Sequence, residues 1–360
     1  MHAMSSTAIA VGALLLGSSA LYIATHARKA LRWLAIMAAA PLAVAVSIPP
    51  TPAMAASFPP LTYSRYITPS SLANSSSGVP NMFTMGCNQG RASDSEGQPR
   101  QIVLMNFGDP GWNNAGTFGA YPGPFVPMST IETAVENYMQ AFWDCTVAGS
   151  HSFMIVAPGV TNANGGVTYG TGQAWGQMIG DLVNWISNRG YGAQLYAAGA
   201  WDVEPGWNGV GVSEAWLNGL MSTLPASHYY YDFGSADDCP PFGSCSNGWT
   251  QADVYHVAWG AAPALAVPQI YVQYCNCNNS AGQAREWQQV SLWGAVNAGY
   301  RINFSAALSQ SVACADMGDS CYLEDNSPQD SWNMLLSYIN SDSRTSGSIP
   351  YSTVMSYQAT

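Results

Sequence analysis

The sequence reads Ala-Gln-Leu-Tyr-Ala-Ala-Gly-Ala-Trp-Asp-Val at residues 193–203, an apolar run that is typical of a buried strand. Helical periodicity follows at residues 212–224, and a second apolar run follows at 228–233. A strand, a helix and a strand in this order predict a parallel sheet whose faces are covered by helices. The stretch 193–233 therefore favours an α/β fold.

The same alternation continues on both sides of this stretch. Further strands are expected at 102–107, 151–160, 265–272 and 302–308. Further helices are expected at 129–146, 172–188, 250–259, 281–298 and 331–339. The chain thus shows six strand–helix cycles, and the connection in the sixth cycle is long and contains cysteines.

A doubly wound sheet and a (β/α) TIM-like barrel both satisfy this pattern. The glycine-rich phosphate loops of doubly wound folds are absent after the first expected strand, which favours the barrel. The span 101–345 matches the roughly 250 residues of such a barrel. Two strands remain to be found, in residues 57–90 or in the C-terminal part; otherwise the barrel is incomplete or irregular. Residues 56–100 are expected to be an extended N-terminal segment, and 346–360 a C-terminal tail.

Residues 1–55 read as a signal peptide or leader. A basic cluster at 28–32 precedes an apolar run at 34–48, and Ala53-Met54-Ala55 then forms a small-x-small cleavage site. The earlier apolar stretch at 7–24 is long enough for a membrane hairpin to be the alternative. Either reading places the domain outside the cytoplasm, secreted or at the cell surface, and the first predicts no stable membrane insertion after processing.

The charge balance excludes several partners. After residue 55 the chain has seven arginines, no lysine and twenty-one acids, a formal charge of −14. Nucleic acid is excluded because its binding depends on basic side chains that neutralise phosphates. The absence of lysine excludes Schiff-base chemistry in this region. The protein is expected to be a monomer.

All eight cysteines lie after the leader, and an even number in an exported chain predicts disulfides that staple loops. The spacing favours Cys239 with Cys245 and Cys314 with Cys321, while Cys87 with Cys145 ties the N-terminal segment to a helix end. Cys275 and Cys277 are then left as a pair. No histidine motif with ligand spacing accompanies them, so no metal and no cofactor are expected.

The strongest candidate site follows the strand that opened this section. Asp202 and Glu204 alternate with Val203 at its end, so both side chains project to one face, about 6.6 Å apart along the backbone. Functional residues of a barrel lie at the C-terminal ends of its strands. Two neighbouring carboxyl groups push their pKa values apart, which allows one to act as an acid while the other stays charged. The alternative is that Asp202 caps a turn and Glu204 is solvated.

Weaker candidates lie near the ends of other strands. Asp232 is the third catalytic candidate, expected to orient the substrate or to face Glu204 as the second carboxylate, and the alternative is that it initiates the turn before Gly234. The expected substrate-binding residues are polar side chains within or after strands and aromatic side chains near loops, on which sugar rings can stack. They are Asp109, Gln269, Tyr271, Asn303, Trp112, Trp207 and Trp259. Glu286 falls in a helix and is expected at the surface.

A strand that ends in Asp202-Val203-Glu204, in an exported chain with strand–helix cycles, resembles the barrel glycoside hydrolases, among them the lysozyme-like muramidases and the chitinase-like enzymes. The longer Asp-x-x-Asp-x-Asp-x-Glu signature of chitinases is missing, because Ala197 and Ala200 occupy its earlier positions. The resemblance implies that Glu204 is the general acid and that Asp202 stabilises or orients the intermediate.

The sequence thus predicts a secreted glycoside hydrolase that acts on a polysaccharide or peptidoglycan-like glycan with neutral or amino sugars. The alternative is a carbohydrate-binding or cell-surface protein that keeps the barrel without turnover. No Gly-x-Ser-x-Gly elbow is present, which disfavours an esterase of the α/β-hydrolase class.

Overall fold

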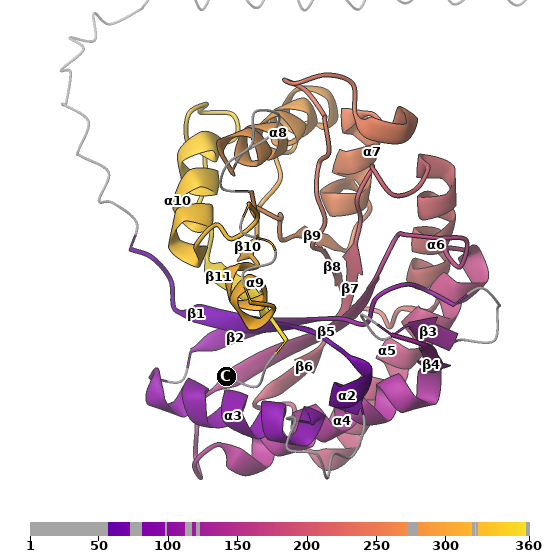
Figure 1. Ribbon diagram of the computed structural model, residues 1–360, viewed down its shortest axis with the longest axis vertical. Helices are drawn as coiled ribbons and strands as arrows, with labels where there is room; N and C mark the ends of the chain where they lie inside the picture. Colours follow the sequence, from indigo (N-terminus) through magenta and orange to yellow (C-terminus); the bar gives the residue numbers. More distant parts are fainter. Residues whose placement is uncertain are drawn as a thin grey trace, which may run out of the picture. The chain divides into compact units, whose positions relative to one another are not determined.

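The computed structural model describes residues 57–72, 81–97, 99–111, 117–119, 123–272, 280–318, 321 and 323–357. Its main sheet is parallel and is nearly closed into a barrel (Figure 1). The strands of this barrel are β1 (Leu61–Tyr66), β2 (Arg100–Asn106), β5 (Phe153–Thr161), the interrupted pair β6 (Leu195–Ala197) and β7 (Gly199–Asp202), β8 (Tyr230–Asp232), β9 (Ala264–Ala266), β10 (Ala306–Ser309) and β11 (Tyr351–Ser356).

Neighbouring barrel strands follow one another in the chain, and the first and last strands pair with each other. Leu61 to Arg65 of β1 lie opposite Ser352 to Ser356 of β11 in parallel register. The other edges meet through a single parallel bridge between Gln269, just after β9, and Leu308 of β10. The expected TIM-like α/β barrel is therefore confirmed, with an irregular closure between β9 and β10.

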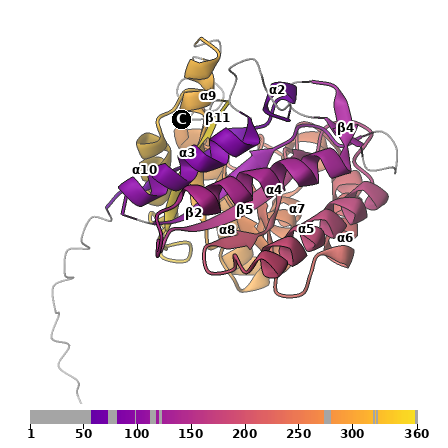
Figure 2. The ribbon, with the colours of Figure 1, turned by 90° about the horizontal axis from the view of Figure 1, so that it is seen from below.

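Helices lie outside the sheet, between consecutive strands, as Figures 1 and 2 show. The described α-helices are α2 (Pro69–Leu72), α3 (Met82–Ser95), α4 (Met128–Cys145), α5 (Tyr169–Arg189), α6 (Val210–Thr223), α7 (Gln251–Tyr255), α8 (Ser280–Trp293), α9 (Ser311–Asp316) and α10 (Pro328–Ile339). Two π-helical turns, η2 (His256–Gly260) and η3 (Gly294–Ala298), extend α7 and α8, and η1 (Ser246–Gly248) is a short 3-10 turn. A small antiparallel hairpin, β3 (Thr117–Gly119) with β4 (Phe125–Pro127), lies outside the barrel sheet.

The predicted limits of the barrel, 101 and 345, are too narrow. Residues 56–100 were expected to be extended, yet they contain β1, α2 and α3. Residues 346–360 were expected to be a tail, yet they contain β11. The two missing strands therefore lie one at each end of the domain.

Both strands lie in the regions where two further strands were expected, but the sequence did not locate them because hydroxyl side chains interrupt their apolar pattern. Ser64 and Thr353 are fully buried and hydrogen-bond to each other across β1 and β11 at 2.8 Å. Thr62 Oγ1 donates to the carbonyl oxygen of Ile102 on β2 at 3.0 Å. These bonds satisfy polar groups that would otherwise be costly to bury, so the strands are stable without an apolar signature.

Apolar side chains pack on both faces of the barrel strands. Inside the barrel, a cluster includes Leu104, Ala200 and Tyr231. Between the strands and the helices, a larger cluster includes Trp175, Trp201 and other residues. Because side chains alternate along a strand, Ala200 inside and Trp201 outside place Asp202 on the inner face of β7.

Three disulfides stabilise the described part of the domain. Cys87 of α3 is joined to Cys145 at the end of α4, and Cys239–Cys245 and Cys314–Cys321 close short loops. These are the pairs that the spacing predicted, whereas Cys275 and Cys277 lie outside the described residues. The bonds indicate an oxidising, extracytoplasmic environment. Among the described helices, none has the length and apolar character needed to cross a membrane.

Candidate active site

A pocket of ≈ 470 Å³ lies at the C-terminal ends of the barrel strands. It is lined by polar and aromatic residues from most of the strand ends, a feature typical of active sites in barrel enzymes. The lining residues are Tyr66, Asn106, Asp109, Thr161, Ala163, Asp202, Glu204, Trp207, Ser235, Asp237, Gln269, Tyr271, Val272, Gln283, Gln310 and Glu324. Six of the ten residues predicted from the sequence lie together here: Asp109, Asp202, Glu204, Trp207, Gln269 and Tyr271.

Asp202 ends β7, and its side chain is almost fully buried. Its Oδ2 accepts a hydrogen bond from Asn106 Nδ2 at 3.0 Å, and its Oδ1 accepts one from Gln269 Nε2 at 2.7 Å. Burial raises the pKa of Asp202 well above its ordinary value and the charge of Glu204 adds to the rise, whereas the bond from Asn106 lowers it. Asp202 therefore holds its proton to a higher pH than an ordinary carboxyl group, although the two amide bonds favour its ionised form.

Glu204 lies two residues after β7, and its backbone is held by Asn162. Asn162 Oδ1 accepts a bond from the Glu204 amide at 3.0 Å, and Asn162 Nδ2 donates to the Glu204 carbonyl at 3.0 Å. Burial raises the pKa of Glu204 to about 8, and the charge of Asp237 adds to the rise, while a hydrogen bond from Gln269 opposes it. Glu204 is therefore mainly protonated at neutral pH, which is the state a general acid needs.

Asp232 is not part of the pocket lining. Tyr231 and Phe233, its neighbours in the chain, belong to the cluster inside the barrel, so Asp232 falls on the opposite face of β8. Its Oδ1 accepts a bond from the amide of Gly234 at 3.2 Å, and burial raises its pKa to about 7. The expectation that Asp232 faces Glu204 is thus corrected by the register of β8, although its charge still raises the pKa of Glu204.

The pocket contains two further acids that the sequence did not single out. Asp237 accepts bonds from Ser235 Oγ at 2.6 Å and from the amide of Gly206 at 3.1 Å. Glu324 accepts a bond from Gln310 Nε2 at 2.8 Å on the side of the pocket formed by Tyr66 and Gln310. With Asp109, Asp202 and Glu204 they make five acids, and none of the lining residues is basic.

Aromatic side chains form part of the walls. Trp207 is 44% exposed although it is large and apolar, and it lies at the rim. Tyr271 is buried and lines the interior, and burial raises its pKa well above the ordinary value. Tyr66 donates from its hydroxyl to Gln310 Oε1 at 3.0 Å. The pocket therefore offers both stacking surfaces and hydrogen-bonding groups.

Three other predicted binding residues do not join this pocket. Asn303 and Trp259 line a different cavity, which is described below. The strand expected at 302–308 begins only at Ala306, so Asn303 precedes it and lies at the opposite end of the barrel. Trp112 lies outside the described residues. Glu286, expected at the surface, is buried in α8.

The rule that functional residues of a barrel lie at the C-terminal ends of its strands would have predicted more residues of this site. Asn106 ends β2, Thr161 ends β5 and Gln310 follows β10, and all three line the pocket. Each is a polar residue at the C-terminal end of a strand, the position where barrel enzymes place function. Tyr66 was not predicted because the position of β1 was not identified, and Glu324 was not predicted because it lies on a loop far from its nearest strand in the chain.

No described group of three or more histidine, cysteine or acidic side chains has an arrangement suited to hold a metal ion. We compared the chain with models of protein families, with curated proteins and with solved structures, and none of them matches it.

Proposed function

We propose that the protein is a secreted glycoside hydrolase that cleaves an extracellular polysaccharide by acid–base catalysis. Glu204 is the general acid that protonates the leaving oxygen of the glycosidic bond. Asp202 is the carboxylate that stabilises the positive charge developing on the sugar or orients the attacking group. The reaction adds one water across the bond, and the proton that Glu204 donates is returned to it from that water.

The observation that carries this proposal is a pair of neighbouring buried carboxyl groups that line one pocket. Burial raises the pKa of both groups, that of Glu204 to about 8, and two amide hydrogen bonds favour the ionised form of Asp202, so the pair can hold one proton between them. Glycoside hydrolysis needs one carboxylic acid and one carboxylate at the same pH. A site that only bound sugars would not need two ionisable acids buried side by side, because burying such groups is costly.

The charge of the pocket supports a substrate class. Five acids and no basic residue line it, so a substrate rich in carboxylates or sulfates would be repelled. Neutral or amino sugars, including those of a peptidoglycan-like glycan, suit such a surface. Trp207 supplies an exposed apolar face at the rim for a sugar ring.

The second candidate is a carbohydrate-binding protein that has the pocket but no turnover. The exposed Trp207 and the many hydrogen-bonding groups of the pocket serve that role equally well. The two candidates differ only in whether Glu204 and Asp202 act chemically.

The release of reducing ends separates the candidates. The wild type and Glu204→Gln are incubated with a panel of neutral, amino-sugar and peptidoglycan substrates. The matched control is Glu136→Gln, since Glu136 lies on α4 outside the barrel. Hydrolysis is expected for the wild type and the control, with a fall of at least about 100-fold in Glu204→Gln. Glycan binding without release by the wild type would instead favour the binding protein.

A further inference from the structure

A second cavity, which we name the Arg301 pocket, has a volume of ≈ 460 Å³. It is lined by Trp259, Ala295, Gly299, Tyr300, Arg301, Asn303 and Arg344. These residues precede β9, β10 or β11 in the chain, so the pocket lies at the N-terminal end of the barrel. Asn303 precedes β10 whereas Gln310 follows it, which separates the Arg301 pocket from the candidate active site by the length of that strand.

Arg301 carries a charge that the described residues do not balance. Its side chain is partly buried, and it makes no salt bridge or hydrogen bond with the described part of the chain. Its guanidinium lies against Gly347, where an added Cβ would come within 2.7 Å of Nη1. A guanidinium is always charged and has five donors, so a partly desolvated one without partners is suited to receive an anion.

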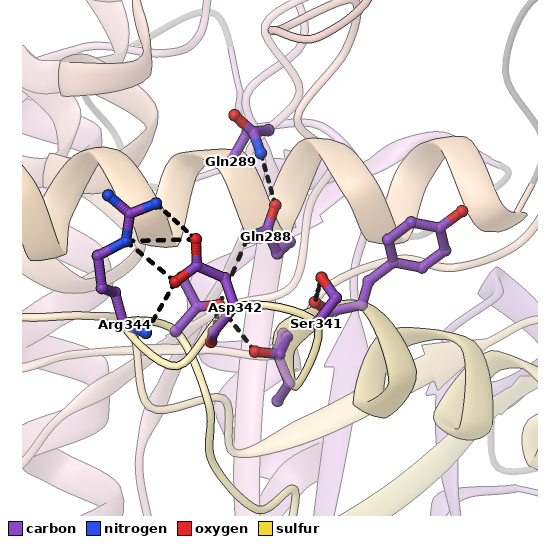
Figure 3. Close-up of polar contacts among 8 residues, drawn as sticks. Gln288, Gln289, Ser341, Asp342 and Arg344 are labelled. Carbon is purple, nitrogen blue, oxygen red and sulfur yellow. Dashed lines mark hydrogen bonds and ion pairs between the residues drawn. The ribbon is translucent and has the colours of Figure 1, made fainter.

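Arg344, the second cation of the pocket, is held in place by Asp342. Its Nη2 donates to Asp342 Oδ2 at 2.6 Å, and its Nε donates to Oδ1 at 3.0 Å. Figure 3 shows this pair, with the guanidinium of Arg344 fixed along one edge by the carboxylate. Nη1 has no bond to the described residues, so Arg344 presents a fixed donor that a ligand can use.

Aromatic residues complete the pocket. Tyr300 has 72% of its surface exposed, the largest exposed fraction of any large apolar side chain described. Its backbone is fixed, since its carbonyl accepts a bond from Tyr255 Oη at 3.0 Å and its amide donates to Gly294 at 3.2 Å. Trp259 is partly exposed in the same pocket. An exposed ring on a fixed backbone offers a stacking face at a small entropic cost.

The charge of the rest of the molecule makes this pocket distinctive. The region after residue 55 has only seven basic side chains and a formal charge of −14. Two of those seven meet here, beside two aromatic rings. The candidate active site has the opposite character, with five acids and no basic residue. An anionic ligand is thus repelled by one end of the barrel and attracted by the other.

We propose that the Arg301 pocket is a second glycan-binding site, which takes a sugar that bears a carboxylate. The guanidinium groups of Arg301 and Arg344 bind the carboxylate, and Tyr300 or Trp259 stacks on the sugar ring. The chemistry selects a carboxylate because planar guanidinium groups match its geometry, and it selects a sugar because an aromatic wall adjoins the cations. This site does not depend on glycosidic cleavage at Glu204.

Isothermal titration calorimetry with two tetrasaccharides tests the proposal. The probes are a hyaluronan tetrasaccharide, which carries carboxylates, and chitotetraose, which is neutral. Measurements use Glu204→Gln, so that cleavage does not interfere, and are repeated with the wild type. The hyaluronan fragment is expected to bind at least about ten-fold more tightly than chitotetraose to this site, and more weakly as salt is raised. Inorganic sulfate is titrated separately, to separate sugar recognition from simple anion binding.

Two arginine variants locate the binding. Arg301→Ala is expected to weaken binding of the hyaluronan fragment by about ten-fold or more. Arg91→Ala removes the same charge from the exposed face of α3 and is expected to leave binding unchanged. Tyr300→Ala should weaken the sugar but not sulfate. Equal effects of the two arginine variants, or equal affinity for sulfate and the hyaluronan fragment, would overturn the proposal. Because binding is measured without turnover, either result is independent of whether the protein is a hydrolase.

Discussion

Gln269 Nε2 donates a hydrogen bond to Asp202 Oδ1 at 2.7 Å, although the two residues lie 67 positions apart in the chain. Asp202 ends β7 and Gln269 follows β9, so one strand, β8, lies between them. Asn106, at the end of β2, reaches the other oxygen of Asp202 across β5. In a barrel, side chains from alternate strands meet in one interior layer, which is why these three residues meet. Asp202 is therefore held from both sides by rigid elements.

The bond from Asn106 leads to a prediction on the pH dependence of activity. In Asn106→Ala the carboxylate of Asp202 loses a donor that favours its ionised form, so the pKa of Asp202 rises. We expect the acidic limb of the kcat/KM profile to move to higher pH, with a loss of about ten-fold on that limb. The measurement is the pH profile on the best glycan substrate. Asn188→Ala, on the exposed end of α5, is the control, and a uniform loss at every pH would indicate a structural defect instead.

The raised pKa of Glu204 leads to a prediction on stability. The ordinary pKa of a glutamate is 4.5, and in the folded protein that of Glu204 is about 8. The folded state therefore binds this proton more tightly than the unfolded state, and stability is lost as pH rises from about 4.5 to about 8. In Glu204→Gln the side chain cannot ionise, so the variant lacks this loss of stability. Its unfolding free energy should therefore rise relative to that of the wild type as pH increases across this range.

Denaturant unfolding of both proteins between pH 4 and pH 9 checks this sign. Each pKa unit corresponds to about 1.4 kcal/mol at most, and partial exposure of Glu204 reduces that figure. The difference between the two proteins should be smallest at pH 4 and level off above the pKa of Glu204. A difference that does not change with pH would show that Glu204 ionises alike in the folded and unfolded states.

Trp207 is predicted to contribute to substrate binding more than to the chemical step. Its ring is 44% exposed and lines the same pocket as Asp202, whose carboxyl group is buried. In Trp207→Ala, KM should rise by about 5- to 30-fold, the effect of losing one or two kcal/mol, with kcat changed less. Trp207→Phe should recover part of the loss because it keeps a ring. Phe242→Ala is a control, since Phe242 is similarly exposed but does not line the pocket.

The sequence predicted the barrel and the central carboxyl pair because both follow from strand alternation. Apolar runs such as 193–203 mark buried parallel strands, and the period of two places Asp202 and Glu204 on one face. It expected two further strands but did not locate β1 and β11, because Ser64, Thr353 and their neighbours satisfy their hydroxyl groups across strands that are distant in the chain. Such pairings form only when the barrel closes, so no local sequence pattern predicts them.

The placement of single residues depended on strand boundaries that the sequence leaves uncertain. Asp232 was assigned to the mouth of the barrel, but the register of β8 gives that face to Tyr231 and Phe233. Asn303 was assigned to the interior of a strand that starts three residues later, at Ala306. A shift of one residue reverses the face of a side chain, and a shift of three moves it to the other end of the barrel.

The Cys87–Cys145 disulfide is predicted to stabilise the fold without affecting the chemistry. It joins α3 to the end of α4 across 58 residues, and neither cysteine lines the candidate active site. The double variant Cys87→Ala/Cys145→Ala should lose about 2–4 kcal/mol of unfolding free energy. The pH profile of activity should be unchanged at temperatures where the variant stays folded. A shifted profile would mean that this bond positions the catalytic groups.

The protonation state of Glu204 at neutral pH is the most direct test of the catalytic assignment. The carboxyl carbons of glutamate are labelled with ¹³C, and the signal of Glu204 is identified by its loss in Glu204→Gln. We predict that this signal titrates with a pKa of about 8, so that Glu204 carries its proton at pH 7. A midpoint near the ordinary value of 4.5 would leave Glu204 ionised at pH 7 and would contradict its assignment as the general acid.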